Sequence, residues 1–335
     1  MKHFIQNKLL FLSLFLLLVF STATACSSSS NNLTKVTLNE VAHSIFYAPQ
    51  YVAYENGYFK EEGIDLVITT GFGADKTMTA LISGDANIGF MGSESSIYQY
   101  NEGNEDYAIN FAQLTKRAGN FLVGRQKETT FDWNSLRGKT IIGGRKGGMP
   151  QMVLEYVLKK HGLDPVKDLT IVQNIDFANT AGAFTGGTGD YTVEFEPNAT
   201  LLEQKKIGNV VASMGVESGY IPYTSYCAKK SYIEKNPEII QKFTNAIYKG
   251  QQYVKTHSAK EIATIIKPQF PETDLETLTN IVERYKSQDT FCENPVLEED
   301  GFLLLQNILN EAGELKQPVE YNTLVNTEFA KNAIK

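Results

Sequence analysis

The chain has 335 residues, of which 42% are hydrophobic and 21% are charged, and this composition is typical of a globular protein with a substantial core. Its length suits two domains of ordinary size. The net charge of −7, without a basic cluster, argues against a nucleic-acid-binding protein.

The N-terminus has the features of an export signal. Lys2 and Lys8 accompany an apolar run at 9–20, which is shorter than the roughly 20 residues that a membrane-spanning helix needs. Small residues then precede Cys26, and a polar run of serines and asparagines follows it. We therefore expect a signal peptide over 1–25.

The segment around Cys26 resembles the lipobox of bacterial lipoproteins, although Ala23 stands where leucine is usual. The resemblance implies cleavage before Cys26 and diacylation of its sulfur. Two acyl chains would anchor the protein stably, with 26–33 as a flexible tether. The alternative is ordinary secretion after cleavage at Ala25.

From Thr34 onward, predicted strands alternate with predicted helices. The strands cover 36–42, 64–70, 86–91 and 109–114, and the helices cover 46–56, 74–83 and 93–100. Ser93 or Ser95 is expected to cap the third of these helices. Alternation of this kind predicts an α/β fold built on a parallel, doubly wound sheet.

The same pattern then starts again, which indicates a second α/β lobe. Its predicted strands cover 139–144, 169–173, 190–195 and 209–213, with helices at 149–161, 179–184 and 197–205. A strand at 225–228 and helices at 236–256, 258–266, 273–286 and 298–312 complete the chain. We expect lobe 1 to hold 34–115 plus 225–335, and lobe 2 to hold 122–220, with strands 109–114 and 225–228 as the crossings.

Motifs for enzyme chemistry are sparse. There is no nucleophile elbow, phosphate loop or zinc-binding helix motif, and the glycine-rich run Gly143–Gly148 lacks the ending of a phosphate loop. His161 stands at a helix end, where capping explains it. Cys227 and Cys292 could pair in an exported protein, but two buried free thiols are the favoured interpretation. The sequence predicts a protein that is not an enzyme and needs no metal or cofactor.

Aromatic and polar residues gather in the turns that follow the predicted strands. In open α/β sheets ligands bind beyond the carboxyl ends of the strands, so these residues should converge on one cleft. Aromatic rings with a few polar groups suit a small, flat, polar ligand. The candidate ligand-binding residues are Ser44, Phe46, Tyr47, Gln50, Phe72, Ser93, Glu94, Arg117, Gly148, Met149, Asn179, Glu194, Glu196 and Tyr223.

Three segments carry a family resemblance. Ser44–Leu66, Leu81–Phe90 and Leu136–Ile141 resemble motifs of periplasmic substrate-binding proteins of the nitrate/sulfonate/taurine and thiamine-pyrimidine type. The resemblance implies the type II periplasmic-binding-protein fold, whose two lobes close on a small-molecule ligand. It also implies a monomer that delivers its ligand to an ABC permease. Together with the lipobox, it predicts a lipoprotein exported and anchored to the outer face of the cell membrane.

The charges in the predicted cleft bear on the ligand. Glu94, Glu194 and Glu196 would repel an anion and would accept hydrogen bonds from an amino-heterocycle, so a thiamine-pyrimidine precursor or similar heteroaromatic is favoured. A sulfonate, taurine or nitrate ligand remains the alternative, with Arg117 and Arg145-Lys146 as its partners.

Two further classes of protein are alternatives. A thiamine-pyrimidine synthase shares the fold, but that family's Cys-rich iron-binding motif has no counterpart here. An extracellular sensor is disfavoured because no transmembrane segment or cytoplasmic module follows Lys335.

Overall fold

The computed structural model describes residues 33–128 and 130–335. The predicted signal peptide over 1–25 and the predicted lipidation site Cys26 lie outside these residues. Thr34–Lys335 forms one compact unit, which is described here by itself. Within the described part of the chain, no helix combines the length and the apolar character needed to cross a membrane.

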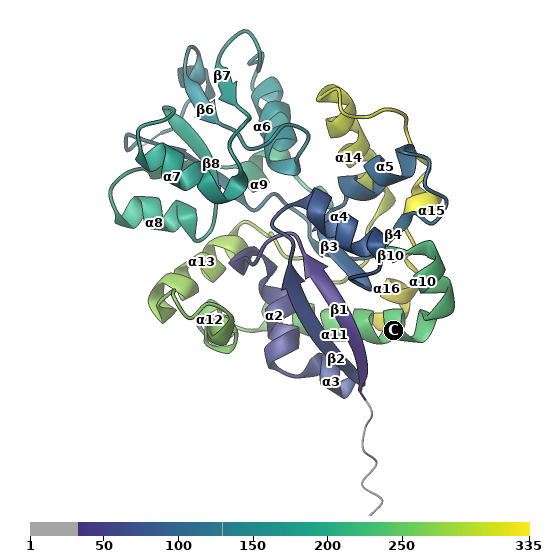
Figure 1. The fold of residues 1–335 in the computed structure, drawn as a ribbon. Coiled ribbons are helices and arrows are strands. Elements are labelled where there is room, and N and C mark those ends of the chain that lie inside the picture. The colour runs from purple at the N-terminus through teal and green to yellow at the C-terminus, as the bar shows by residue number, and fades with distance from the viewer. Residues whose placement is uncertain (1–32, 129) are drawn as a thin grey trace, which may run out of the picture. The chain divides into compact units, whose positions relative to one another are not determined.

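Two five-stranded sheets organise this unit (Figure 1). The first has the spatial order β2 (Ile64–Thr70), β1 (Thr34–Glu40), β3 (Ile88–Gly92), β10 (Thr224–Lys229) and β4 (Ala108–Thr115). The second has the order β7 (Thr170–Val172), β6 (Thr140–Ile142), β8 (Tyr191–Phe195), β5 (Asn120–Gly124) and β9 (Asn209–Ser213). The predicted α/β architecture is confirmed.

Both sheets are mixed, so the prediction of a purely parallel sheet is wrong. β10 runs antiparallel to β3 and β4, and β5 runs antiparallel to β8 and β9. The chain passes between the sheets through two short segments, 116–119 and 219–223. β5 and β10, the two reversed strands, are the ones that the chain enters directly from the other sheet.

Helices surround both sheets. The helices that belong with the first sheet are α2 (Ala48–Glu55), α3 (Tyr58–Glu61), α4 (Ala74–Ser83), α5 (Glu94–Asn101), α10 (Lys230–Lys235), α11 (Pro237–Thr256), α15 (Tyr321–Leu324) and α16 (Glu328–Ala333). The helices that belong with the second sheet are α6 (Met149–Lys160), α7 (Thr180–Thr185), α8 (Asn198–Gln204) and α9 (Met214–Ser218). The remaining helices are α12 (Ala259–Ile266), α13 (Leu275–Ser287) and α14 (Glu299–Glu311), with short 3-10 turns at Ile45–Tyr47, Trp133–Leu136, Phe177–Asn179 and Lys267–Gln269.

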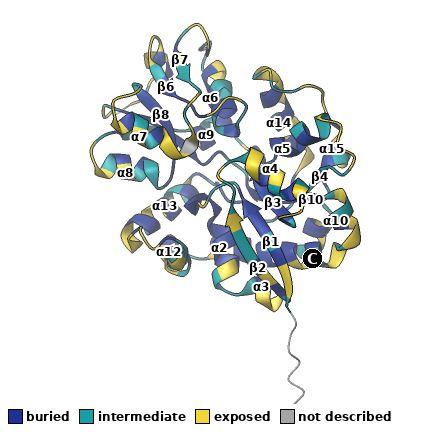
Figure 2. Ribbon diagram, viewed as in Figure 1, coloured by how far each residue is buried: buried dark blue, intermediate teal, exposed yellow. Residues whose placement is uncertain are grey.

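Helical periodicity explains how α11 packs. Pro237 stands in its first turn, where proline loses no helical hydrogen bond. Ile240, Phe243, Ile247 and Val254 recur at helical spacing and are all buried. Figure 2 shows the buried residues along the strands of both sheets and the exposed ones on the outer helix faces.

Strand register aligns the ends of the strands at one edge of each sheet. In the first sheet, Glu40 at the end of β1 lies opposite Thr70 of β2 and Phe90 of β3. Thr224, at the start of the antiparallel β10, lies opposite Gly92 at the end of β3. The turns that follow β1, β2 and β3 therefore lie at the same edge of the sheet as the segment that leads into the antiparallel β10.

The two cysteines of the described chain are buried and free, as the favoured interpretation predicted. Burial raises the pKa of the Cys227 thiol to about 12, and that of Cys292 also rises. Neither thiol has the lowered pKa of a reactive cysteine.

Candidate ligand-binding site

The centre of the candidate site is the buried ring of Phe46, in the turn after β1. Its centroid lies 5.2 Å from that of Tyr47, 5.6 Å from that of Tyr223 and 5.6 Å from that of Phe195. Phe195 ends β8 of the second sheet, whereas Phe46 follows a strand of the first. These four rings, the aromatic cluster, therefore join elements of both sheets. Nearby, the Ser44 hydroxyl donates to the backbone carbonyl of Glu196 at 3.4 Å.

Glu94 brings an ionisable group to this cluster. It occupies the first turn of α5 and is only 3% exposed. Its Oε2 atom has no hydrogen-bond partner among the described residues. Desolvation raises its pKa from the usual 4.5 to about 8, while a hydrogen bond from its own backbone N–H acts in the opposite direction. Glu94 is therefore mainly protonated at neutral pH and can donate as well as accept a hydrogen bond.

The Glu94 carboxyl packs against Gly92, which has no side chain. A Cβ atom added at Gly92 would lie 2.1 Å from Oε2 of Glu94, so the carboxyl occupies the space that a larger residue would fill. A side chain at this position would therefore displace the carboxyl from where it now lies.

Tyr223 supplies a second polar atom. It precedes β10 and is 3% exposed, and its hydroxyl has no hydrogen-bond partner in the described chain. Burial raises the Tyr223 pKa far above its ordinary value, and the nearby Glu94 charge raises it further. Desolvation likewise raises the pKa of Tyr47, again with Glu94 contributing. Glu94, Tyr47 and Tyr223 thus lie close enough to interact electrostatically inside an apolar surround.

The other two predicted glutamates have bonded partners. Both oxygens of the Glu194 carboxyl accept hydrogen bonds, from the Thr180 hydroxyl at 3.1 Å and the Thr192 hydroxyl at 2.7 Å. Glu196 pairs with Arg284 at 2.6 Å, and its other oxygen accepts from the backbone N–H of Thr200 at 2.9 Å. Desolvation raises the pKa of both glutamates, that of Glu194 to about 7.

Two more predicted residues make internal bonds. The Gln50 amide donates to Glu40 at 2.7 Å and accepts from the Tyr226 hydroxyl at 2.9 Å. Ser93 precedes α5 but makes no side-chain cap, so that prediction is wrong. Its hydroxyl donates instead to the carbonyl of Pro222 at 2.7 Å, because β10 lies beside β3 and the segment leading into β10 brings that acceptor close.

The remaining candidates have other surroundings. Arg117 donates to the carbonyl of Gly215 at 2.9 Å, and its guanidinium lies 4.1 Å from the centroid of the Tyr220 ring. Gly148 and Met149 begin α6, with Met149 buried. Phe72 is 73% exposed at a left-handed turn, and Asn179 is exposed at the start of α7.

Sequence analysis missed one residue of this region, Asn120. It begins β5, a strand that was not predicted, and it lies opposite Phe195 of β8. The available signal was a polar residue directly before the short apolar run Phe121–Val123.

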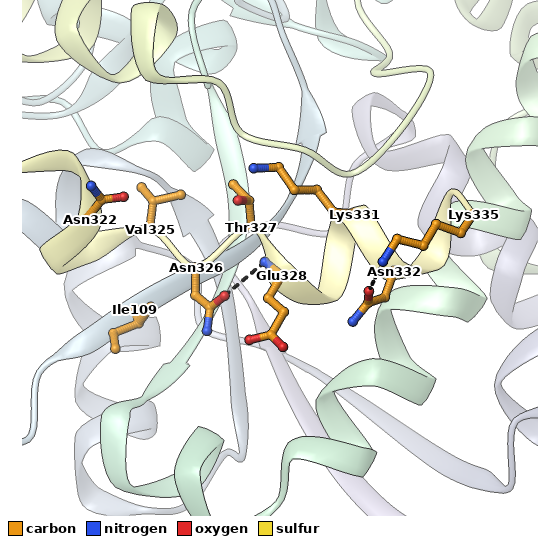
Figure 3. Close-up of a pocket in the computed structure, with 9 residues that line it drawn as sticks. All are labelled: Ile109, Asn322, Val325, Asn326, Thr327, Glu328, Lys331, Asn332 and Lys335. Atoms are coloured by element: carbon orange, nitrogen blue, oxygen red, sulfur yellow. Dashed lines mark hydrogen bonds between the residues drawn. The ribbon is translucent and has the colours of Figure 1, made fainter.

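Two described pockets lie elsewhere. One, of about 370 Å³, is lined by Tyr58, Tyr248, Lys249, Gln252, Tyr253, Thr256 and His257. Figure 3 shows the other, of about 600 Å³, lined by Ile109, Asn322, Val325, Asn326, Thr327, Glu328, Lys331, Asn332 and Lys335. Neither contains a predicted ligand-binding residue. The described residues contain no group of three or more histidine, cysteine, aspartate or glutamate side chains placed to hold a metal ion.

Comparison with known proteins defines the class of fold. The alkanesulfonate-binding protein SsuA from Xanthomonas axonopodis pv. citri superposes with a TM-score of 0.70, at 14% identity, over 88% of this chain and 98% of that chain. The fold is therefore that of the periplasmic binding proteins. The chain belongs to the NMT1/THI5-like family, whose model matches residues 45–261, and the predicted family resemblance is confirmed.

Two relatives span most of the chain. YtlA, a candidate binding protein of Bacillus subtilis (strain 168), is 53% identical over 309 residues, or 92% of each chain. A 4-amino-5-hydroxymethyl-2-methylpyrimidine phosphate synthase of Candida albicans (strain WO-1) is 24% identical over 260 residues, covering 74% of this chain and 75% of the relative.

Proposed function

We propose that the protein is the solute-binding component of an ABC importer and that its ligand is a small amino-heteroaromatic, such as a thiamine-pyrimidine precursor. The fold and the YtlA relative support the binding role. The relative named for an aminopyrimidine phosphate supports the ligand class. The observation that carries the proposal is the buried Glu94 carboxyl, which has an unpartnered oxygen beside an aromatic cluster.

The chemistry of Glu94 suits such a ligand. A protonated carboxyl offers an O–H donor next to a carbonyl acceptor, which matches a ring nitrogen beside an amino group. A more basic ring could take the proton and leave a charge-assisted pair. Flat rings could also stack against Phe46 or Tyr47. An anion could use only the O–H donor of the protonated carboxyl and would leave its carbonyl oxygen unpaired. Of the predicted cations, Arg117 donates to Gly215 and lies over the Tyr220 ring, while its Nε has no partner among the described residues.

Among the predicted residues, we assign direct ligand contact to Ser44, Phe46, Tyr47, Glu94 and Tyr223. Gln50, Ser93, Arg117, Glu194 and Glu196 hold surrounding segments in place through their internal bonds. Gly148 and Met149 set the start of α6, while Phe72 and Asn179 stand on exposed turns where a moving lobe could bring them to the ligand.

The clamp mechanism follows from the topology. Lobe 1 (34–115 plus 225–335) and lobe 2 (122–220) would rotate about the two connecting segments, 116–119 and 219–223. Ligand shifts this equilibrium only through contacts that it makes in the closed state and lacks in the open one. Contacts of one ligand with both Glu94 and residues of lobe 2 would meet that condition.

Export and anchoring complete the proposal. Cleavage before Cys26 and acylation of its sulfur would hold the protein at the outer face of the membrane, near its permease. As a monomer on a short tether, it would deliver ligand without leaving the membrane surface.

A thermal-shift panel tests the ligand class. The panel contains 4-amino-5-hydroxymethyl-2-methylpyrimidine, its N-formyl analogue, riboflavin, taurine, an alkanesulfonate and nitrate. A true ligand at 100 times its dissociation constant should stabilise the protein by about 2.7 kcal/mol. Stabilisation by aminopyrimidines supports the proposal. Stabilisation by sulfonate or nitrate alone would replace it with the anion alternative, and turnover of a pyrimidine would point to an enzyme.

A further inference from the structure

Asn120 is a buried amide whose hydrogen-bonding capacity is unused. Its side chain is 0% exposed, and neither Oδ1 nor Nδ2 has a hydrogen-bond partner among the described residues. A carboxamide can accept through oxygen and donate twice through nitrogen, so leaving it unpaired inside a protein is costly. Such a group indicates a hydrogen-bond partner that the described residues do not themselves provide.

A second buried asparagine shows the usual arrangement. Asn110 of β4 is 1% exposed, and its amide nitrogen donates to the Ser96 hydroxyl at 3.1 Å and to the Leu324 carbonyl at 3.2 Å. Its oxygen accepts from the Ser225 hydroxyl at 2.5 Å. Asn110 is therefore a matched control for Asn120, with the same residue type and the same burial but full pairing.

Strand pairing shows which way Asn120 faces. It lies directly opposite Phe195 in the antiparallel pair of β5 and β8, and directly opposed residues project to the same face of a sheet. The Phe195 ring contacts both Phe46 and Tyr223. The backbone just before Asn120 also passes close to the cluster, because a Cβ added at Gly119 would lie 2.4 Å from the Phe46 ring. Asn120 thus shares a face of the second sheet with Phe195, the ring that this sheet contributes to the aromatic cluster.

Unpaired polar groups therefore approach the cluster from both sheets. Glu94 and Tyr223 flank strands of the first sheet, and Asn120 belongs to the second. One flat molecule with polar edges could satisfy both sides. An amide pairs best with an edge that places a donor beside an acceptor, as an amino group next to a ring nitrogen does. A sulfonate or nitrate has only acceptors and would leave Oδ1 of Asn120 unpaired.

We propose that Asn120 is a specificity-determining residue that pairs through its carboxamide with a donor–acceptor edge of the heterocyclic ligand, on the side of the ring away from Glu94. This inference rests on the proposed function and adds to it the hydrogen-bonding pattern that the ligand must carry. The ligand needs two polar edges, one read by each lobe.

One test needs no ligand. Asn120→Leu replaces an unpaired amide with an apolar group of similar branching, so the ligand-free protein should keep or gain thermal stability. Asn110→Leu removes an amide that makes three hydrogen bonds and should lower the melting temperature clearly. If Asn120→Leu lowers the melting temperature as much as Asn110→Leu does, Asn120 has a structural role and the inference fails.

The second test measures affinity for 4-amino-5-hydroxymethyl-2-methylpyrimidine by titration calorimetry. Asn120→Leu should weaken binding about ten- to hundred-fold, and Asn120→Asp should also weaken it because the amide donor is lost. Equal affinity of wild type and Asn120→Leu would overturn the role of Asn120 while leaving the proposed function intact. If wild type binds none of the heterocycles in the panel, the proposed function is overturned. The hydrogen-bonding pattern proposed for the ligand is then overturned with it.

Discussion

Replacing Glu94 by glutamine removes an ionisable group from a buried position and keeps its shape. The folded protein holds this proton with a pKa of about 8, against the usual 4.5 that applies to the unfolded chain. Because the folded pKa is raised, the contribution of Glu94 to stability is fully present below pH 4.5. It is lost progressively as the pH rises from there through about 8.

The size of this effect follows from the difference between the pKa values of Glu94 in the folded and unfolded chain, because protonation and stability are linked. Each pH unit between the two pKa values changes the free energy of unfolding by about 1.4 kcal/mol. Between about pH 5.5 and 8.5 the loss in wild type is on the order of 3 kcal/mol. For a chain of this size that corresponds to about 6 °C in Tm. Glu94→Gln should escape this loss.

The assay is thermal unfolding of ligand-free wild type and Glu94→Gln at both pH values. The difference in Tm between the variant and wild type should widen in favour of the variant at the higher pH. Glu102→Gln, which changes an exposed residue at the end of α5, serves as the control and should follow wild type. A difference that stays constant with pH would refute the claim that Glu94 is buried without a partner for its charge.

Three further changes test other parts of the account. Gly92→Ala should push the Glu94 carboxyl out of place and weaken aminopyrimidine binding about tenfold in calorimetry, with little change in Tm; unchanged affinity would separate Gly92 from the site. Arg284→Met leaves the buried Glu196 carboxylate without its cation, so urea unfolding should show a loss of about 2–3 kcal/mol, and a loss near zero would contradict the pairing. Cys26→Ser should release the protein from the membrane fraction of cells; unchanged membrane association would exclude acylation of Cys26 as the anchor.

Local sequence patterns were sufficient for most of the fold. The helix predicted over 74–83 is observed as Ala74–Ser83, because Gly73 and Gly84 bound a regular helical run. Strand direction was not predictable in the same way. β5 and β10, which the chain enters from the other sheet, run antiparallel to their neighbours, and local hydrophobic patterns carry no information about direction.

The candidate site shows the same division. Phe46, Tyr47 and Glu94 follow strands, and the sequence predicts their place at the sheet edge; their contact with ligand stays a prediction. Asn120 was missed because it starts an antiparallel strand, and only the observed topology brings strand starts to that edge.

Whether a buried polar group is already paired could not be predicted either. Gln50 is engaged because Tyr226, 176 positions later in the chain, donates to it. Glu196 is engaged because Arg284 arrives from α13. Glu94 has no such partner for one of its oxygens. These three residues look alike in the sequence, and only contacts between distant segments distinguish them.

The central claim is that the protein binds an amino-heteroaromatic ligand through Glu94. Titration calorimetry of wild type and Glu94→Gln with 4-amino-5-hydroxymethyl-2-methylpyrimidine, and of wild type with an alkanesulfonate, tests it most directly. We expect saturable binding of the pyrimidine by wild type, at least tenfold weaker binding by the variant, and no binding of the sulfonate. Tight binding of the sulfonate with no response to the pyrimidine would contradict it.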